Sequence, residues 1–337
     1  MPLQKKESLV RSTACETRAS SADLSRRGLL TVGAAALGAA YAGAAGAAEK
    51  PFFQRRDLPV GIQLYTLGPD LQKDLDAQLA TVAKIGFKSV ELAGYLGRTP
   101  AELRAAFDKA GLVCPSAHIS PKGASGPSFS GDLAKLADEL HVIGVKAAIM
   151  PILYIPDRLG GADLRQAGPQ MTADDWKWNA DFLNEKAAVL KKAGIVSGYH
   201  NHNFEFAPLK GAKGAKGGDT NGMEILLKGT DPSLVTFEMD AGWVTAAGQD
   251  PFALLKAHPG RFTQMHVKDI KPTTKANFEL RQDPTEVGGG MIDWKRLLPA
   301  AYAAGVRGFY VEQEPPFAHS RLDSAKISFD YLARVVA

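Results

Sequence analysis

Eight short apolar runs, separated by segments with helical periodicity, organise the chain from residue 60 onward. Runs of this length, bounded by glycine, proline or polar residues, are typical of buried strands. They cover residues 60–65, 89–92, 112–118, 145–150, 195–200, 234–240, 262–267 and 309–312. Eight strand–helix units predict an α/β fold of the (β/α)8 TIM barrel type, with a doubly wound open sheet as the main alternative.

The segments between the runs carry helix signals. Apolar residues at helical spacing predict a helix over 71–85. Thr172, with Asp175 three residues later, predicts the start of a long helix that ends at Lys192. Glycines lie at or just before several strand starts, as helix C-caps do: Gly86, Gly111, Gly144, Gly194 and Gly305. No G-x-G-x-x-G follows the first run, which weakens a dinucleotide-binding open sheet.

The first 48 residues have the features of an export signal. Arg26 and Arg27 precede an Ala/Gly-rich apolar run over 31–48 with a small-residue A-x-A site. This pattern predicts a cleaved twin-arginine signal and a periplasmic or secreted protein. The alternative is a transmembrane anchor, but the run is barely long enough and poor in Leu and Ile. We therefore expect no stable membrane anchor, a linker over 49–58 and one barrel domain over 59–337.

Charge and cysteine content also depend on this leader. Residues 1–48 carry six basic and three acidic side chains, so they supply +3 of the formal charge of +4. The remaining chain is close to neutral, which gives no argument for a nucleic-acid partner. One of the two cysteines lies in the leader, so Cys114 remains alone and no internal disulfide is possible.

Two stretches interrupt the regular alternation. Residues 210–218 are rich in lysine and glycine and follow the fifth run; residues 271–291 follow the seventh and end near three consecutive glycines. Loops at the carboxyl ends of barrel strands build active sites. We expect the first stretch to be a flexible, solvated surface loop and the second to be a lid.

Pairs of ionisable residues end the last four strands. Residues two apart share one face of a strand, and the pairs are His200 with His202, Glu238 with Asp240, His266 with Lys268, and Glu312 with Glu314. All four pairs are expected at one rim of the barrel. Side chains this polar are costly to bury without partners, so their coincidence indicates a site.

The chemistry of these side chains suits a metal. Asp240, His266 and Glu312 offer two carboxylates and one imidazole, and His200 or His202 could add a fourth ligand. Such a set predicts one divalent metal: Mn, Zn, Co, Fe or Mg. The alternative is an ion-pair network without a metal. Glu91 and His118 end earlier strands and could bind substrate or serve in structural hydrogen bonds, and Trp243 could be a pocket wall or a core residue.

Five segments together resemble the xylose isomerase-like TIM-barrel family of sugar epimerases and isomerases. They read YHNHNFEF, FEMDAGWV, RFTQMHVKD, EVGGGMIDW and YVEQEPP, in order from residue 199 to residue 316. The resemblance implies one divalent metal held by Glu, Asp, His and Glu at the ends of strands five to eight. Asp240, His266 and Glu312 match three of these ligands. At strand five the chain departs from the pattern, because His200 stands where the epimerases have a glutamate that also works as an acid/base group; Glu205 could replace it.

The hypothesis is a metal-dependent sugar isomerase or epimerase that removes a proton next to a sugar carbonyl through a metal-stabilised ene-diolate. Glu312 or Glu205 would act as the base, with Lys268 assisting. Substrate contacts are expected from five residues: Glu91, His118, His202, Trp243 and Glu314. The expected partner is a small-molecule sugar, and a homodimer is one option among oligomeric states that the sequence leaves open.

Three alternatives remain. The missing strand-five glutamate favours a one-base 3-keto-sugar or glycoside lyase over a two-base epimerase. A phosphodiesterase of the endonuclease-IV type shares the barrel but would need more than the seven histidines of this chain and a basic face. A non-catalytic periplasmic sugar-binding protein would keep Trp243 and the polar rim without a metal.

Overall fold

Eight parallel strands form a closed barrel in the computed structural model, which describes residues 49–123, 126–160, 162–214 and 219–337. The order around the barrel is β1, β12, β9, β8, β5, β4, β3 and β2. These strands are β1 (Gly61–Gln63), β2 (Ser89–Ala93), β3 (Val113–His118), β4 (Ala147–Met150), β5 (Val196–His200), β8 (Val235–Asp240), β9 (Phe262–Val267) and β12 (Gly308–Val311). The predicted (β/α)8 barrel is confirmed, and the open sheet is wrong. The predicted export signal, residues 1–48, lies outside the described residues.

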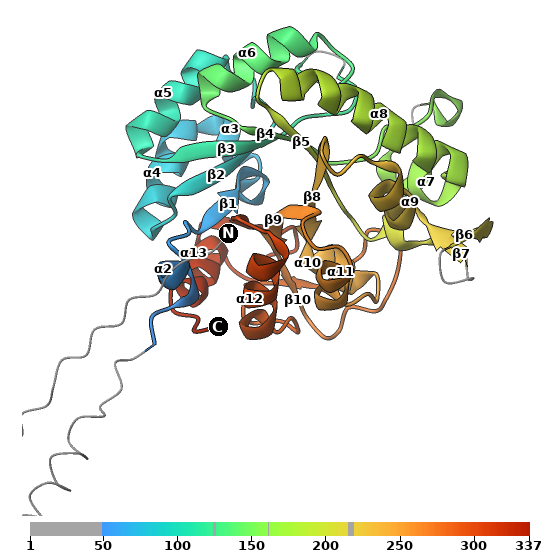
Figure 1. The fold of residues 1–337 in the computed structure, drawn as a ribbon. Coiled ribbons are helices and arrows are strands. Elements are labelled where there is room, and N and C mark those ends of the chain that lie inside the picture. The colour runs from blue at the N-terminus through green and yellow to red at the C-terminus, as the bar shows by residue number, and fades with distance from the viewer. Residues whose placement is uncertain (1–48, 124–125, 161, 215–218) are drawn as a thin grey trace, which may run out of the picture. The chain divides into compact units, whose positions relative to one another are not determined.

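Helices surround the strands on the outside of the barrel (Figure 1). The main ones are α4 (Leu75–Ile85), α5 (Pro100–Ala110), α6 (Leu133–Ile143), α8 (Ala173–Lys192), α9 (Gly222–Gly229), α11 (Pro251–Ala257), α12 (Trp294–Ala304) and α13 (Arg321–Leu332). In the described part of the chain, no helix combines the length and apolar character that crossing a bilayer requires.

Side-chain caps explain where several helices begin. The Thr172 side chain and Asp175 form the predicted capping box at the start of α8, which ends at Lys192 as expected. The predicted helix over 71–85 is instead divided into α3 (Asp70–Lys73) and α4, because Asp74 leaves the helical conformation and its side chain caps α4 by accepting from Ala77 N. Gly111 closes α5 in the left-handed conformation (φ 68°) that glycine adopts without strain.

The core lies between the strands and the helices, and it extends to the amino end of the barrel. Phe52 and Phe53, in α2 (Phe52–Arg56), are buried and pack edge-on against Phe309 of β12, with ring centroids 6.1 and 5.5 Å apart. Phe52 N also donates to Val335 O. The predicted linker over 49–58 therefore contains a helix that belongs to the barrel domain, since two aromatic rings gain more by burial than by exposure.

The two stretches that interrupt the alternation adopt small antiparallel pairs. Part of the Lys/Gly-rich stretch, expected as an irregular loop, pairs as β6 (Pro208–Lys213) with β7 (Asp219–Asn221), while residues 215–218 lie outside the described ones. The 271–291 stretch is closed by β10 (Asp269–Ile270) and β11 (Pro284–Thr285). The remaining short helices are η1 (Leu64–Leu67), η2 (Asp157–Leu159), α7 (Leu164–Ala167), η3 (Gly168–Gln170), η4 (Phe204–Phe206) and α10 (Ala241–Ala246).

Candidate metal centre

Four buried side chains meet at the carboxyl ends of four neighbouring strands. His200 ends β5, Asp240 ends β8, His266 lies in β9, and Glu312 directly follows β12. Asp240 stands opposite His266 in the register of β8 and β9. One ligand-type atom from each of the four lies within 4.8 Å of the others. We call these four residues the donor cluster.

The donor cluster fits a divalent metal in both spacing and chemistry. His266 Nδ1 lies 3.0 Å from Glu312 Oε2 and 3.8 Å from Asp240 Oδ2, and His200 Nε2 lies 4.0 Å from Asp240 Oδ2. Ligand atoms about 2.1 Å from one ion lie roughly 3–4 Å apart, so these separations suit shared coordination. Two imidazoles with two carboxylates favour Zn, Fe, Mn or Co.

Lys268, two residues after His266, adds a positive charge to the cluster. Its fully buried ammonium lies 2.9 Å from Asp240 Oδ2 and 2.7 Å from Glu312 Oε2, and it stands over the Trp243 ring. Its third partner is Glu314, also at 2.7 Å. Burial disfavours the ammonium, but these carboxylates outweigh burial and raise the pKa of Lys268 well above its ordinary value. Lys268 is therefore a fixed cation at the cluster.

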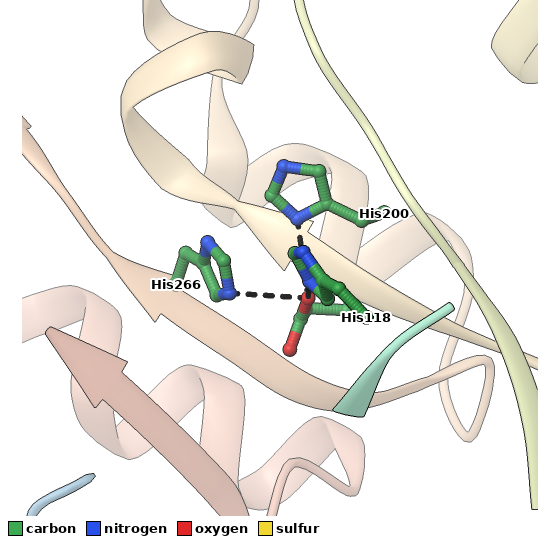
Figure 2. Close-up of side chains that lie close together, drawn as sticks. His118, His200 and His266 are labelled. Atoms are coloured by element: carbon green, nitrogen blue, oxygen red, sulfur yellow. Dashed lines mark hydrogen bonds and ion pairs between the residues drawn. The ribbon is translucent and has the colours of Figure 1, made fainter. Parts of the chain in front are cut away.

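A second layer of polar side chains lies beneath the donor cluster. Glu238, two residues before Asp240, places its Oε2 atom 2.9 Å from His118 Nε2, 3.2 Å from His200 Nδ1 and 3.1 Å from His266 Nε2. Figure 2 shows the three imidazole rings directed toward this shared carboxylate. Glu91 Oε2 contacts His266 Nε2 at 2.7 Å and accepts from Gln63 Nε2.

The charges in this layer differ because the two glutamates have different neighbours. Burial, together with the charge of Glu238, raises the pKa of Glu91. Glu238 is equally buried, but the surrounding imidazoles, His266 above all, hold its pKa well below the ordinary value. Burial and the neighbouring His266 lower the pKa of His200 to about 4, so His200 is a neutral imidazole.

A pocket of about 380 Å³ opens over these layers. Its wall includes His200 and Glu312 of the donor cluster, together with three predicted substrate-binding residues: His118, His202 and Glu314. Tyr65, which is 56% exposed, stands at the wall as well. A larger hollow of about 600 Å³ beside Tyr331 contains no comparable ligand group among the described residues. The pocket that adjoins the donor cluster is therefore the candidate active site.

Besides Asp240, His266 and Lys268, three predicted site residues lie outside the wall of this pocket. Glu91 is fully buried in the lower layer, and Trp243 packs in α10 beneath Lys268. Glu205 is fully buried in η4, where its carboxylate accepts from the Tyr199 hydroxyl and from His202 N, at 2.8 and 2.9 Å. The turn at η4 directs Glu205 to the outer side of β5, so the structure does not bring it to the donor cluster.

His202 is the strand-five residue nearest the substrate space. It lines the pocket, and its ring packs against those of His200 and Trp243. Burial and the neighbouring His200 lower its pKa well below the ordinary value, so it is neutral. Its Nδ1 atom is buried without a hydrogen-bond partner in the described structure. This arrangement suits contact with a bound molecule better than a role as metal ligand.

The 271–291 segment is fixed at both ends. Asn203 donates to the Asn277 side-chain oxygen at 2.9 Å and accepts from Leu280 N at 3.1 Å, which joins the segment to the strand-five loop. Asp269 accepts from Gly288 N and from Trp294 Nε1 at the other end. The predicted lid is thus an anchored segment beside the site.

Sequence reasoning did not give Glu238 a role. It placed Glu238 on the same face as Asp240, and that pairing was the available signal. Alternation along a strand tells which face a side chain occupies, but it does not tell that three histidines from β3, β5 and β9 converge on one oxygen. That convergence follows from closure of the barrel.

Comparison with known proteins agrees with this architecture. Inosose dehydratase from Geobacillus kaustophilus (strain HTA426) is 25% identical over 285 residues, which cover 77% of this chain and 87% of the relative. A sugar phosphate isomerase/epimerase from Parabacteroides distasonis ATCC 8503 has 27% identity and a TM-score of 0.63, and covers 86% of this chain and 96% of its own. The IOLI protein, whose crystal structure holds a zinc atom, has 15% identity and a TM-score of 0.57 over 82% of this chain and 98% of its own, and shares the fold.

The first two of these proteins are named as enzymes, an inosose dehydratase and a sugar phosphate isomerase/epimerase, and the expectation that this chain is an enzyme is confirmed. Residues 79–335 match the xylose isomerase-like TIM barrel family over most of the chain. The five segments that suggested this resemblance span the strands that carry the donor cluster. This chain therefore belongs to the xylose isomerase-like TIM barrel family.

Proposed function

We propose that this chain is a divalent-metal-dependent enzyme that removes a proton next to the carbonyl of a neutral, sugar-like ketone. The observation that carries the proposal is the donor cluster beneath a pocket with a free carboxylate at its wall. His200, Asp240, His266 and Glu312 would hold the metal. When bound, the metal would polarise the carbonyl and stabilise the negative charge that develops on its oxygen.

Glu314 is the proposed base. It lines the pocket, is partly exposed, and lies outside the donor cluster, so its carboxylate faces the space that a substrate carbon would occupy. The Lys268 ammonium contacts Glu314 at 2.7 Å and so fixes the position of this carboxylate. The edges of His118 and of the neutral His202 at the pocket wall would orient hydroxyl groups by hydrogen bonds.

Elimination of water is the outcome that we favour. Glu314 would take the α-proton and then deliver it to the departing β-hydroxyl, which forms a carbon–carbon double bond and releases one water. This sequence needs one carboxylate, and Glu314 is the one carboxylate at the pocket wall outside the donor cluster among the described residues. The relatives named inosose dehydratase support it.

Isomerisation is the second candidate, supported by the similarity to a named sugar phosphate isomerase/epimerase. Here Glu314 would return its proton to the neighbouring carbon. Two-base epimerisation is disfavoured, because His200 stands at the strand-five position and Glu205 lies outside the pocket wall.

The pocket wall favours an uncharged substrate over a phosphorylated one. In the described residues the wall carries Glu312 and Glu314 but neither arginine nor lysine. Lys268 is fully buried and already contacts three carboxylates. A phosphate would therefore be repelled. A neutral substrate also accords with the proposed work of the enzyme outside the cytoplasm, which rests on the twin-arginine pattern of the leader.

The test begins with elemental analysis of the purified protein and continues with deuterium exchange. The metal-loaded enzyme is incubated in D2O with a cyclic polyol ketone, and NMR follows loss of the α-hydrogen and formation of the unsaturated ketone. About one metal per chain and α-exchange in wild type, with exchange lost but metal kept in Glu314→Gln, is the expected result. Absence of metal after incubation with Zn, Mn or Co would refute the enzyme proposal and leave the sugar-binding alternative.

A further inference from the structure

Glu238 occupies an unusual place among the buried side chains. It is fully buried at the centre of the lower layer, and its Oε2 atom lies within 3.2 Å of nitrogens from His118, His200 and His266. Glu238 Oε1 has no hydrogen-bond partner in the described structure, so the whole interaction passes through one oxygen. A buried carboxylate in contact with three imidazoles must select which ring nitrogens carry protons.

Two of these rings also belong to the donor cluster, and each uses opposite nitrogens for the two layers. His200 presents Nδ1 to Glu238 and Nε2 to Asp240. His266 does the reverse: Nε2 faces Glu238, while Nδ1 faces Asp240 and Glu312. The two rings therefore approach Glu238 with different edges.

We propose that Glu238 is a positioning residue that fixes opposite tautomers in these two histidines. It accepts from Nδ1–H of His200 and shares with Glu91 the Nε2–H of His266, which leaves the His200 Nε2 and His266 Nδ1 lone pairs directed into the donor cluster. A metal-bound histidine almost always donates its other N–H to such an acceptor, which orients the ring and raises its basicity. Here one oxygen serves both ligands. The inference rests on the proposed metal site.

Glu91 offers a matched comparison within the same layer. Its Oε2 atom also contacts His266 Nε2, at 2.7 Å, but its other hydrogen bonds are to Gln63 and Ser116. The described structure gives Glu91 no contact with His200. Loss of the Glu91 charge should therefore affect His266 alone, whereas loss of the Glu238 charge should affect chiefly His200, because Glu91 still accepts from His266 Nε2.

Nitrogen-15 NMR of the zinc-loaded protein reads the tautomers directly. In wild type we expect His200 protonated on Nδ1 and His266 protonated on Nε2. In Glu238→Gln the His200 ring should lose this fixed state while His266 keeps its Nε2 proton on Glu91, and zinc affinity by competition with a chelator should fall about 10- to 100-fold. In Glu91→Gln the His200 signals should stay unchanged. Circular dichroism and thermal melting verify that each variant is folded.

Two results would overturn the proposal. One is a wild-type spectrum in which His200 is protonated on Nε2, as expected if the metal bound to His118, His200, Glu238 and His266 in the lower layer. The other is wild-type zinc affinity in a folded Glu238→Gln variant. If that variant does not fold, the wild-type spectrum alone decides. If wild type binds no metal, the proposed function fails. The role of Glu238 is then tested on the metal-free protein, in which the neutral His200 must still carry its proton on Nδ1.

Discussion

Asp240 at the end of β8 and Asp269 in β10 are both buried aspartates, but different kinds of group surround their carboxylates. Asp269 accepts from four backbone N–H groups and one indole: Ile270, Gly288, Gly290 and Ile292 N, and Trp294 Nε1. Asp240 uses Oδ1 to cap α10 through Trp243 N at 2.8 Å. Its Oδ2 faces Lys268 at 2.9 Å and the two histidines of the donor cluster.

The difference teaches how to separate a structural carboxylate from a functional one. Neutral donors fixed by the backbone surround Asp269, so its role is to hold the 271–291 segment and the start of α12. Asp240 gives one oxygen to the fold and the other to ionisable side chains that face a pocket. Burial alone is the same for both, and it is the nature of the donors that differs.

The largest expected effect is on metal binding by Asp240→Asn. The amide oxygen can still cap α10, but the negative charge at Oδ2 is lost. A ligand that loses its charge no longer attracts the cation, so metal affinity should fall at least 100-fold, about 2.7 kcal/mol, and turnover with it. Calorimetric titration with zinc measures this. Asp269→Asn is the control and should bind zinc with nearly wild-type affinity; equal losses in the two variants would erase the distinction.

The second-largest expected effect is on the free energy of unfolding, and here Asp269→Asn should lose more than Asp240→Asn. In Asp269→Asn the side-chain NH2 group must face N–H groups whose hydrogen bonds the carboxylate accepted. Hydrogen bonds to charged groups contribute about 1.5–3 kcal/mol each. We expect the free energy of unfolding to fall by about 3 kcal/mol. Urea unfolding of metal-free protein at pH 7 measures it. Asp240→Asn should lose less, because Lys268 keeps Glu312 and Glu314 as partners, and a larger loss in that variant than in Asp269→Asn would contradict the assignment of roles.

The barrel itself could be predicted because its signal repeats. Eight apolar runs separated by helical segments match the eight observed strands, and side-chain alternation placed Asp240, His266 and Glu312 at one rim. The details that failed depend on single interactions. Asp74 ends one helix and caps the next, and Phe52 packs against Phe309, a contact between residues far apart in sequence.

The parts of the site that the sequence could not supply depend on three-dimensional closure. Glu205 follows the strand-five histidines closely in sequence, yet the turn at η4 directs it to Tyr199. Glu238 shares a face with Asp240, but its three histidine partners come from strands on different sides of the barrel. The alternation of side chains along one strand cannot predict such a convergence.

Glu205 extends the comparison as a third buried carboxylate with few donors. Burial raises its pKa to about 7, above the value of about 4.5 expected for an exposed glutamate. Between these values the unfolded chain ionises while the folded protein keeps the proton, so stability falls as pH rises from about 4.5 to 7, by up to about 3 kcal/mol.

Urea unfolding of wild type and Glu205→Gln at pH 5 and pH 8 tests this. The variant lacks the titrating group, so at pH 5 the two proteins should differ in free energy of unfolding only by the cost of the substitution itself. By pH 8 the free energy of unfolding of wild type should have fallen relative to that of the variant. A difference between the two proteins that is independent of pH would show that Glu205 ionises in the folded protein as it does in water.

The smallest expected effect concerns Lys268, the cation that faces Asp240 but not Asp269. Its ammonium lies within 2.9 Å of two carboxylate oxygens of the donor cluster, so it competes with a metal for the same negative charge. Lys268→Met keeps the length of the side chain and removes the charge. Since like charges at this range repel by a few kcal/mol at most in a partly screened site, we expect zinc to bind about tenfold more tightly.

Lys271→Met is the matched control, because Lys271 pairs with Asp283 at the half-exposed surface of the same segment. Its zinc affinity should equal that of wild type. Turnover in Lys268→Met should fall even as zinc binds more tightly, because Glu314 loses the ammonium that fixes the position of its carboxylate. Weaker zinc binding in Lys268→Met would instead mean that the ammonium holds Asp240 and Glu312 in place. Both oxygens of Asp240 would then have a structural role, as both oxygens of Asp269 do.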